Sequence, residues 1–280
     1  MRFSKILAPL MALPSVLALP EAPKNVTSVG KPLHYAMMVF PGFQALDVYG
    51  PLDVIGSQVL MLNQPLHLSI LSRTLAPVTT VPQKSPTMNM THGNFGTQIM
   101  PTTTFKKVLA GKKDKEKGDI DVLLVPGGAA TRGDMTEEIE FVKTMYPKVK
   151  YVLSICTGAT ILARAGILDG RNATTNKRAW AWATSTGPRV NWIPTARWVD
   201  AGNIWTSSGV SAGIDLTFAF VEHLYGKEVA DYTSINLEYP RWPGGPSNDP
   251  FAAVWELEKV GVATATVTGR LVECSLSLGL

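Results

Sequence analysis

The chain has 280 residues, a formal net charge of +4 and 45% apolar residues, which is enough for one large domain or two small ones. This hydrophobicity excludes a disordered chain, and 24 glycines with 20 prolines exclude a coiled coil. The two cysteines, Cys156 and Cys274, exclude a disulfide scaffold and an all-cysteine zinc site. The lysines of the basic stretch 106–117 have no interleaved aromatic residues, so we expect no nucleic-acid partner.

Residues 1–18 have the pattern of a secretory signal peptide, in which Arg2 and Lys5 precede an apolar stretch. Two prolines in that stretch disfavour the alternative, an ordinary apolar helix. No other run approaches the roughly 20 apolar residues of a membrane span. We therefore expect a protein that is secreted or resident in the secretory pathway and has no membrane partner. In that setting the acceptor sequons at Asn25 and Asn89 are candidate glycosylation sites.

Residues 31–250 alternate short apolar runs with helical patterns and show no internal repeat. Continuous apolar runs are typical of parallel strands buried on both faces, so the pattern predicts one α/β domain with helices on both sides of a mostly parallel sheet. Residues 251–280 are expected to form a C-terminal helix and tail. The expected strands are 33–40, 66–71, 122–125 and 151–155, with a hairpin at 198–207, and the expected helices are 48–62, 136–146, 157–165, 214–225 and 251–260.

Cys156 lies where the strand expected at 151–155 turns into the next helix. Gly158 would permit a tight turn, and this is the arrangement of a nucleophile elbow, which exposes the side chain at the sheet edge. The N-terminal end of the following helix would favour the thiolate over the thiol. The alternative is a small buried core residue, which is the usual place of a free cysteine.

Two more features follow buried strands and are expected at the same sheet edge, where ligands bind in such folds. Gly127 and Gly128 follow the strand at 122–125, and they either offer backbone N–H groups to an anion or only form a strand-to-helix turn. Asp47 follows the first strand. In an apolar pocket its carboxyl would keep its proton and act as a general acid, while the alternative is an N-cap for the helix that follows.

These segments, taken together and in this order, resemble the ThiJ/PfpI superfamily of class I glutamine amidotransferase-like proteins, over about residues 33–250. The closest resemblance is to the isonitrile (isocyanide) hydratase branch, and the sensor halves of AraC-type regulators share the motifs. The resemblance implies a flavodoxin-like three-layer sandwich that forms a homodimer and needs no metal or organic cofactor. The motifs are FPGFQALD at 40–47, GPLDV at 50–54, VPGG at 125–128, SICTGA at 154–159, GVSAGID at 209–215 and LEY at 237–239.

The resemblance also implies a reaction on a small molecule, with Cys156 as the nucleophile and Asp47 as its acidic partner. In a hydratase the thiolate would attack the terminal carbon of R–N≡C, Asp47 would donate a proton, and water would release an N-substituted formamide. The N–H groups of Gly128 and Thr157 would hold the anionic sulfur or the attacking water. Thr157 stands where protease-like and glyoxalase-like branches usually carry His, so a Cys–His dyad between neighbouring residues is absent.

Two segments depart from the hydratase pattern and are expected to line the pocket: ATTNK at 173–177 replaces ATTHW, and SSG at 207–209, which ends in Gly209, replaces a glycine triplet. The substrate therefore stays open. The alternatives are a non-catalytic small-molecule or redox sensor on the same fold and another hydrolase or glyoxalase-type activity. An AraC-type regulator would need a DNA-binding region after residue 250, where the sequence is neither basic nor patterned. Asp215, at the start of an apolar helix, is interpreted as a cap.

Overall fold

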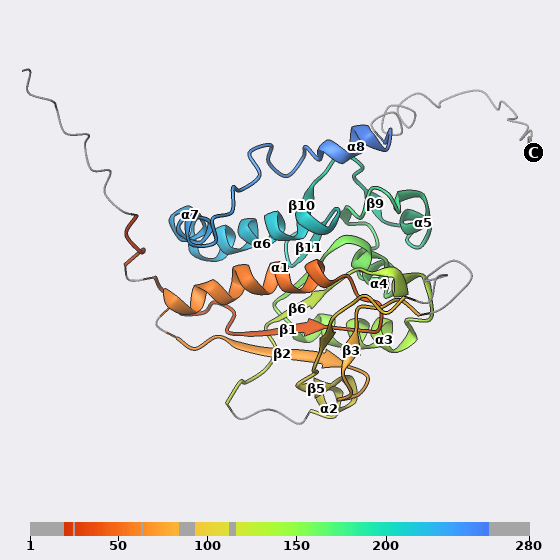
Figure 1. Ribbon diagram of the computed structural model, residues 1–280, viewed down its shortest axis with the longest axis horizontal. Helices are drawn as coiled ribbons and strands as arrows, with labels where there is room; N and C mark the ends of the chain where they lie inside the picture. The colour runs from red at the N-terminus through yellow and green to blue at the C-terminus, as the bar shows by residue number, and fades with distance from the viewer. Residues whose placement is uncertain (1–19, 25, 63, 84–92, 112–115, 258–280) are drawn as a thin grey trace, which may run out of the picture.

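The computed structural model describes residues 20–24, 26–62, 64–83, 93–111 and 116–257, and these build a three-layer α/β fold around a seven-stranded sheet (Figure 1). Every neighbouring pair of strands in this sheet is parallel except β10 and β11, which form the predicted hairpin. In sheet order the strands are β10 (Trp198–Asp200), β11 (Ile204–Ser207), β7 (Tyr151–Ser154), β6 (Val122–Val125), β1 (His34–Met38), β2 (His67–Ser72) and β5 (Thr103–Thr104).

The central strands are continuous apolar runs because helices cover both faces of the sheet. Every residue of β1, β6 and β11 is buried. This confirms the predicted mostly parallel sheet. Two small ladders lie outside it: β3 (Val78–Thr79) pairs antiparallel with β4 (Gln98–Ile99), and β8 (Asn172–Ala173) pairs parallel with β9 (Asn191–Trp192).

The helices divide between the two faces of the sheet, with α1, α6 and α7 on one face and α2 and α3 on the other (Figure 1). The helix α4 packs against α3. The helices are α1 (Ala45–Gly56), α2 (Phe105–Leu109), α3 (Thr136–Met145), α4 (Ala159–Arg164), α5 (Trp180–Ser185), α6 (Val210–Tyr225), α7 (Lys227–Asn236) and α8 (Pro250–Val254). Short 3₁₀ turns occur at Ser57–Leu60, Ala129–Arg132, Tyr146–Lys148 and Cys156–Gly158.

Some boundaries differ from those the sequence predicts, and packing explains one of them. The helix expected from residue 214 begins at Val210. Gly213 lies inside the helix, where it allows close packing, and it does not break the helix. A Cβ on Gly213 would lie 2.6 Å from Ile155 Cγ2. Likewise, a Cβ on Gly50 in α1 would lie 2.8 Å from Ile214 Cγ1, so α1 and α6 meet closely at that glycine.

Several predictions fall on residues outside the described ranges. The signal sequence at 1–18, the sequons at Asn25 and Asn89, and Cys274 lie there, so these stay predictions. The expected helix at 251–260 ends at Val254, and the tail from residue 258 lies outside the described residues. Within the described part of the chain, no helix has the length and apolar character needed to cross a membrane.

Candidate active site

Cys156 lies at the carboxyl end of β7, in the 3₁₀ turn that leads into α4. Its backbone φ is +57°, a left-handed conformation that costs a non-glycine residue roughly 1–2 kcal/mol. The turn is tight, because a Cβ on Gly158 would lie 2.3 Å from the carbonyl oxygen of Val125. A strained turn between a buried strand and a helix is the expected nucleophile elbow.

The environment of the Cys156 thiol raises its pKa above the usual value. Burial is the main cause, and the carboxyl of Asp47 adds to it. Two donors oppose this rise: the backbone N–H of Thr157, and the Asn176 side chain, whose Nδ2 lies 3.2 Å from Sγ. The expectation that the helix end would favour a resting thiolate is therefore wrong, since burial outweighs the donors and the resting group is a thiol.

Asp47 lies in the first turn of α1 and is fully buried. Burial raises the pKa of its carboxyl to about 7, although the N–H of Gly127, 2.9 Å from Oδ2, and the Cys156 thiol lower it. The N-cap interpretation is wrong, because Gln44 occupies that position and the Asp47 side chain faces Gly127. The other oxygen, Oδ1, is buried and has no hydrogen-bond partner among the described residues.

The two glycines after β6 donate their N–H groups to side chains of the site. The N–H of Gly127 donates to Asp47, and the N–H of Gly128 donates to Thr157 Oγ1 at 3.1 Å. The hydroxyl of Thr131 also donates to Thr157 Oγ1, at 3.0 Å. The N–H of Gly127 therefore faces the carboxyl of the protein's own Asp47, and the N–H of Gly128 faces a neutral hydroxyl, so neither points at a substrate anion. Of the predicted donors, the N–H of Thr157 faces the sulfur.

Gly127 has a steric role in addition. A Cβ at this position would lie 2.6 Å from both the nitrogen and Oγ1 of Thr157 and 2.9 Å from Asp47 Oδ2. Gly128 has a φ of +148° and lies against the backbone of residues 42–44. Both glycines thus bring the loop close enough to hold the acid and the nucleophile turn together.

The two segments that depart from the hydratase pattern lie next to each other, and the one that carries Asn176 contacts the thiol. Asn176 donates to Cys156 Sγ, while its Oδ1 accepts from the N–H of Ala179 at 2.9 Å. Thr175 Oγ1 donates to the carbonyl oxygen of Cys156 at 3.0 Å. A Cβ on Gly209 would lie 3.6 Å from Asn176 Nδ2, so Gly209 borders the same amide. The sequence placed these segments near the pocket but did not show that Asn176 contacts the sulfur.

A network of buried charges begins at Lys177, the residue after Asn176. Lys177 Nζ donates to Thr174 Oγ1 and to the carbonyl oxygen of Ala196, both at 2.7 Å, and lies 3.8 Å from Asp249 Oδ2. Burial lowers the pKa of Lys177 to about 8, which the carboxylate of Asp249 partly opposes. This buried lysine fixes the position of the segment that carries Asn176.

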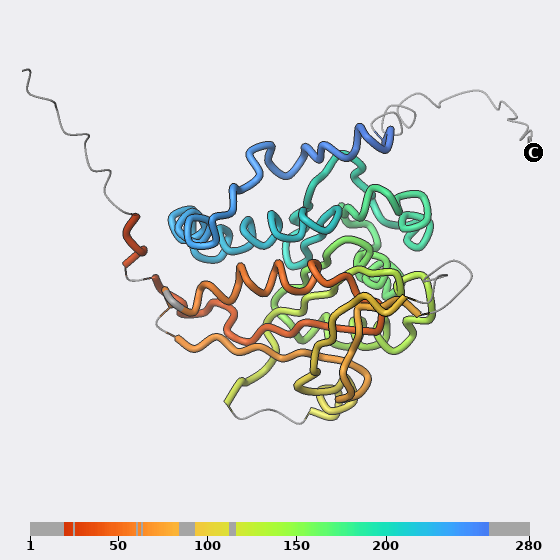
Figure 2. Tube along the Cα trace, viewed as in Figure 1, coloured from red at the N-terminus to blue at the C-terminus, as the bar shows by residue number. Residues whose placement is uncertain are grey.

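The network continues through Arg197, whose Nε lies 2.7 Å from Asp215 Oδ2 and whose Nη1 lies 3.6 Å from Asp249 Oδ1. Tyr239 donates to Asp215 Oδ1 at 2.8 Å. The interpretation of Asp215 as a cap is wrong: Gly209 is the N-cap of α6, and Asp215 is a buried partner of Arg197. Figure 2 shows the segment after α7 running back over α6. Asp249 lies on this segment and joins the network.

The described residues offer no metal site of three or more histidine, cysteine or acidic side chains. His34 and His67 lie in β1 and β2, and His223 lies in α6. Cys156 is a free cysteine. The side chains gathered around Cys156 Sγ are the carboxyl of Asp47 and the amide of Asn176.

The DJ-1/PfpI family profile matches residues 35–223 of this chain. The chain belongs to the DJ-1/PfpI family. It is 33% identical to an isonitrile hydratase of Pseudomonas putida over 234 residues, which cover 81% of this chain and 89% of that protein. It is also 32% identical to a deglycase of Pyrococcus horikoshii over 124 residues, which cover 44% of this chain and 68% of that one.

Among solved structures, a ThiJ/PfpI family protein from Pseudomonas syringae superposes with a TM-score of 0.59 at 27% sequence identity. The match covers 90% of this chain and 96% of that one. This agrees with the flavodoxin-like sandwich that the sequence predicts.

Proposed function

We propose that this protein is a cysteine-dependent lyase that adds water to an isocyanide and releases an N-substituted formamide. The observation that carries the proposal is the placement of Cys156 on a strained turn, between the buried carboxyl of Asp47 and the amide of Asn176. The similarity to an isonitrile hydratase over most of both chains supports the same reaction class.

The resting pair holds one proton above about pH 7, with a Cys156 thiol and an Asp47 carboxylate, because the pKa of the carboxyl is about 7 and that of the thiol is raised above its usual value. As the sulfur attacks the terminal carbon of R–N≡C, Asp47 takes the thiol proton and passes it to that carbon. A C–S bond and a C–H bond form, the S–H bond breaks, and the product is a thioimidate, R–N=CH–S–Cys156. Burial of the pair excludes water from this step.

Water then adds to the thioimidate carbon. One of its protons goes to nitrogen and the other returns to sulfur as the C–S bond breaks, which leaves R–NH–CHO and the thiol. Asp47 is placed to accept and return the proton that moves in this step. Asn176 Nδ2 and the N–H of Thr157 stabilise negative charge on sulfur when it attacks and when it leaves.

The test is turnover of tert-butyl isocyanide to its formamide, followed by proton NMR. We expect Cys156→Ala to lower the rate at least about 1,000-fold, because removing the nucleophile of a covalent mechanism has effects of this order. Asp47→Asn removes the proton carrier and is expected to have a large effect as well. Cys274→Ala, which removes the other cysteine, is the matched control. Full activity of Cys156→Ala would refute the proposal.

Two alternative functions share this site. Burial raises the pKa of the Cys156 thiol, which lowers its reactivity as a redox sensor and as a nucleophile alike. A glyoxalase or deglycase activity of the family type lacks its histidine, since Thr157 follows the cysteine. A panel of an aldehyde, an amide and an isocyanide would separate these activities.

We also propose that residues 1–18 direct the chain into the secretory pathway, that Asn25 and Asn89 carry glycans, and that the protein is a homodimer. An intact mass spectrum of protein from a secreting host would show loss of residues 1–18 and any glycans. Light scattering after size exclusion would give the number of subunits.

A further inference from the structure

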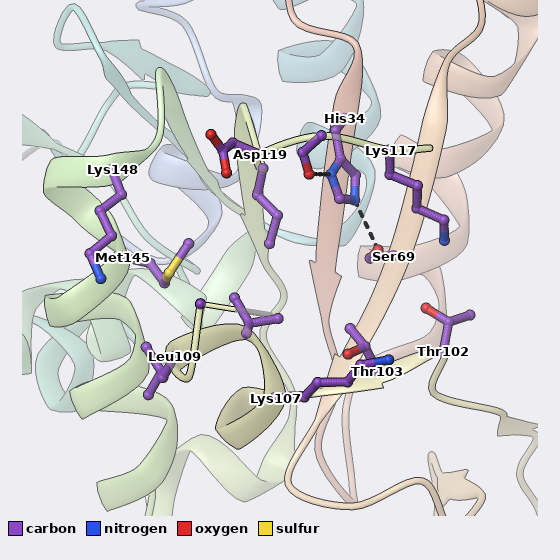
Figure 3. A pocket seen from close by; sticks show the side chains of 14 residues that line it. His34, Ser69, Thr102, Thr103, Lys107, Leu109, Lys117, Asp119, Met145 and Lys148 are labelled. Carbon is purple, nitrogen blue, oxygen red and sulfur yellow. Dashed lines mark hydrogen bonds between the residues drawn. The ribbon is translucent and has the colours of Figure 1, made fainter. Parts of the chain in front are cut away.

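A cavity lies on the side of the sheet where β1 begins, away from Cys156, and Figure 3 shows it from close by. It has a volume of about 530 Å³, which is within the range of small-molecule sites. His34 at the start of β1, Thr103 in β5 and Ile120 just before β6 line it. His34 and Ile120 lie at the amino ends of their strands, and no lining residue of this cavity belongs to the Cys156 site, so the two are separate.

One wall of this cavity carries an ordered polar pair. His34 Nε2 lies 2.9 Å from Ser69 Oγ, and His34 Nδ1 lies 3.2 Å from the carbonyl oxygen of Gly118. A carbonyl only accepts, so Nδ1 carries the ring proton and Nε2 accepts from the Ser69 hydroxyl. Burial and the charge of Lys117 lower the pKa of His34, which keeps the ring neutral. The pair is therefore a fixed neutral part of the wall.

The rim of the cavity is cationic, with Lys107, Lys117 and Lys148 against a single acidic residue, Asp119. Lys117 Nζ donates one hydrogen to the carbonyl oxygen of Leu68 at 3.1 Å, which anchors the ammonium group above the cavity. An ammonium group has three donors, so others are available to a ligand. In Figure 3, Lys107 and Lys117 lie on the same side as the two threonines at 102 and 103.

The opposite wall is apolar and includes Leu109, Ile120 and Met145. Leu109 is 39% exposed and so is open to a ligand in the cavity. In Figure 3, Lys107 and Lys117 lie away from Leu109 and Met145, whereas Lys148 lies beside Met145. A ligand with one anionic end and one apolar end matches this lining.

We propose that this cavity binds a small organic anion, with its anionic group at Lys107 and Lys117 and its apolar part against Leu109, Ile120 and Met145. Carboxylates, sulfonates and phosphate monoesters share the required chemistry. The isocyano and formamide groups are both uncharged, so the reaction proposed at Cys156 does not itself require an anion here. The inference does not depend on the activity of Cys156.

The test uses the full chain and two fluorescent probes of almost the same shape. 1-Anilinonaphthalene-8-sulfonate is an aromatic anion, and N-phenyl-1-naphthylamine is its neutral counterpart. We expect saturable binding of one sulfonate per chain, at least about tenfold tighter than the neutral probe. Amide shifts in a ¹⁵N-correlated NMR spectrum should concentrate at Thr103, Gly118 and Ile120.

Lysine substitutions provide the second measurement. Lys107→Gln and Lys117→Gln should each weaken binding of the sulfonate about 3- to 10-fold and leave binding of the neutral probe unchanged. Lys143→Gln is the matched control, because it removes the same charge from an exposed position of α3 outside the cavity. All three variants should keep wild-type isocyanide turnover.

Three results would overturn the proposal. The first is no saturable binding of the sulfonate. The second is equal affinity for both probes, or an affinity that neither lysine substitution changes. The third is binding whose NMR shifts lie at Cys156 or at the exposed apolar residues of α8 instead of this cavity.

Discussion

The two edges of the sheet differ in how they hold their polar groups. At the carboxyl edge, Asp47, Asn176 and Lys177 are buried or nearly so, and each is fixed by the backbone or by another side chain. At the amino edge, Lys107 and Lys148 are exposed at the rim of an open cavity. Buried groups carry large desolvation costs and so depend on their partners, whereas exposed groups are screened by water. Substitutions at the carboxyl edge should therefore have the larger effects.

A pair of glycines gives the largest expected contrast. Gly127→Ala would place a methyl group 2.6 Å from Thr157 and 2.9 Å from Asp47 Oδ2, so the nucleophile turn has to move. We expect kcat/KM for isocyanide hydration to fall more than about 100-fold, since small displacements of reacting groups have effects of this size. Gly118→Ala, at the other edge, meets nothing within 4 Å and is strained only by its φ of +69°. Equal activity of the two variants would contradict the comparison.

A pair of lysines tests stability at the two edges. Lys177→Met removes the ammonium group from Asp249 Oδ2, Thr174 Oγ1 and the carbonyl oxygen of Ala196, so we expect the free energy of unfolding to fall by about 3 kcal/mol. Lys150→Met breaks a 3.0 Å ion pair with Asp121 in which the lysine side chain is 49% exposed, and we expect a loss below about 1 kcal/mol. Urea denaturation of both variants would measure the difference. Similar losses would show that burial is not the deciding factor.

Asn176 should matter for the reaction more than for stability. Asn176→Ala removes the donor 3.2 Å from Cys156 Sγ. One hydrogen bond to a charged group is worth about 1.5–3 kcal/mol, so kcat/KM should fall about 10- to 100-fold. Asn176→His, which restores a ring donor, should recover part of the loss. If Asn176→Ala kept full activity, charge on sulfur would have to be stabilised elsewhere.

The pH dependence should report the Asp47–Cys156 pair. Burial raises the pKa of Asp47 to about 7, and the pair holds the single proton needed for attack only above that value. We therefore expect kcat/KM to rise about tenfold per unit up to about pH 7 and then to level. A flat profile between pH 5.5 and 8 would exclude Asp47 as the proton carrier.

Asp47 also gives a stability effect with a defined sign. A folded-state pKa raised above the unfolded value means that the folded protein binds more protons between about pH 4 and 7, so stability falls as pH rises through that range. A pKa shift of one unit corresponds to about 1.4 kcal/mol, so the loss of stability is at most about 4 kcal/mol. Asp47→Asn should remove it, so that the variant gains stability relative to the wild type at pH 8 but not at pH 4. Parallel pH profiles for the two proteins would contradict this.

The sequence predicted the central sheet because its strands are continuous apolar runs, and it placed Cys156 and Asp47 at one edge because parallel strands end there together. It could not show that Asp47 and Thr157 occupy the N–H groups of Gly127 and Gly128, since those contacts join segments far apart in the chain. The buried partners of Lys177 and Asp215 had no local pattern either. The change from His-Trp to Asn-Lys at 176–177 was the one available signal for this region.

The proposed reaction requires a covalent bond between the sulfur of Cys156 and the substrate carbon. Acid quenching of the enzyme during turnover of tert-butyl isocyanide, followed by digestion and mass spectrometry, would measure it. We predict that the peptide with Cys156 gains the mass of one whole isocyanide, as a thioimidate requires, and that the peptide with Cys274 does not. Formamide production at the full rate while Cys156 stays unmodified, or in Cys156→Ala, would contradict the account.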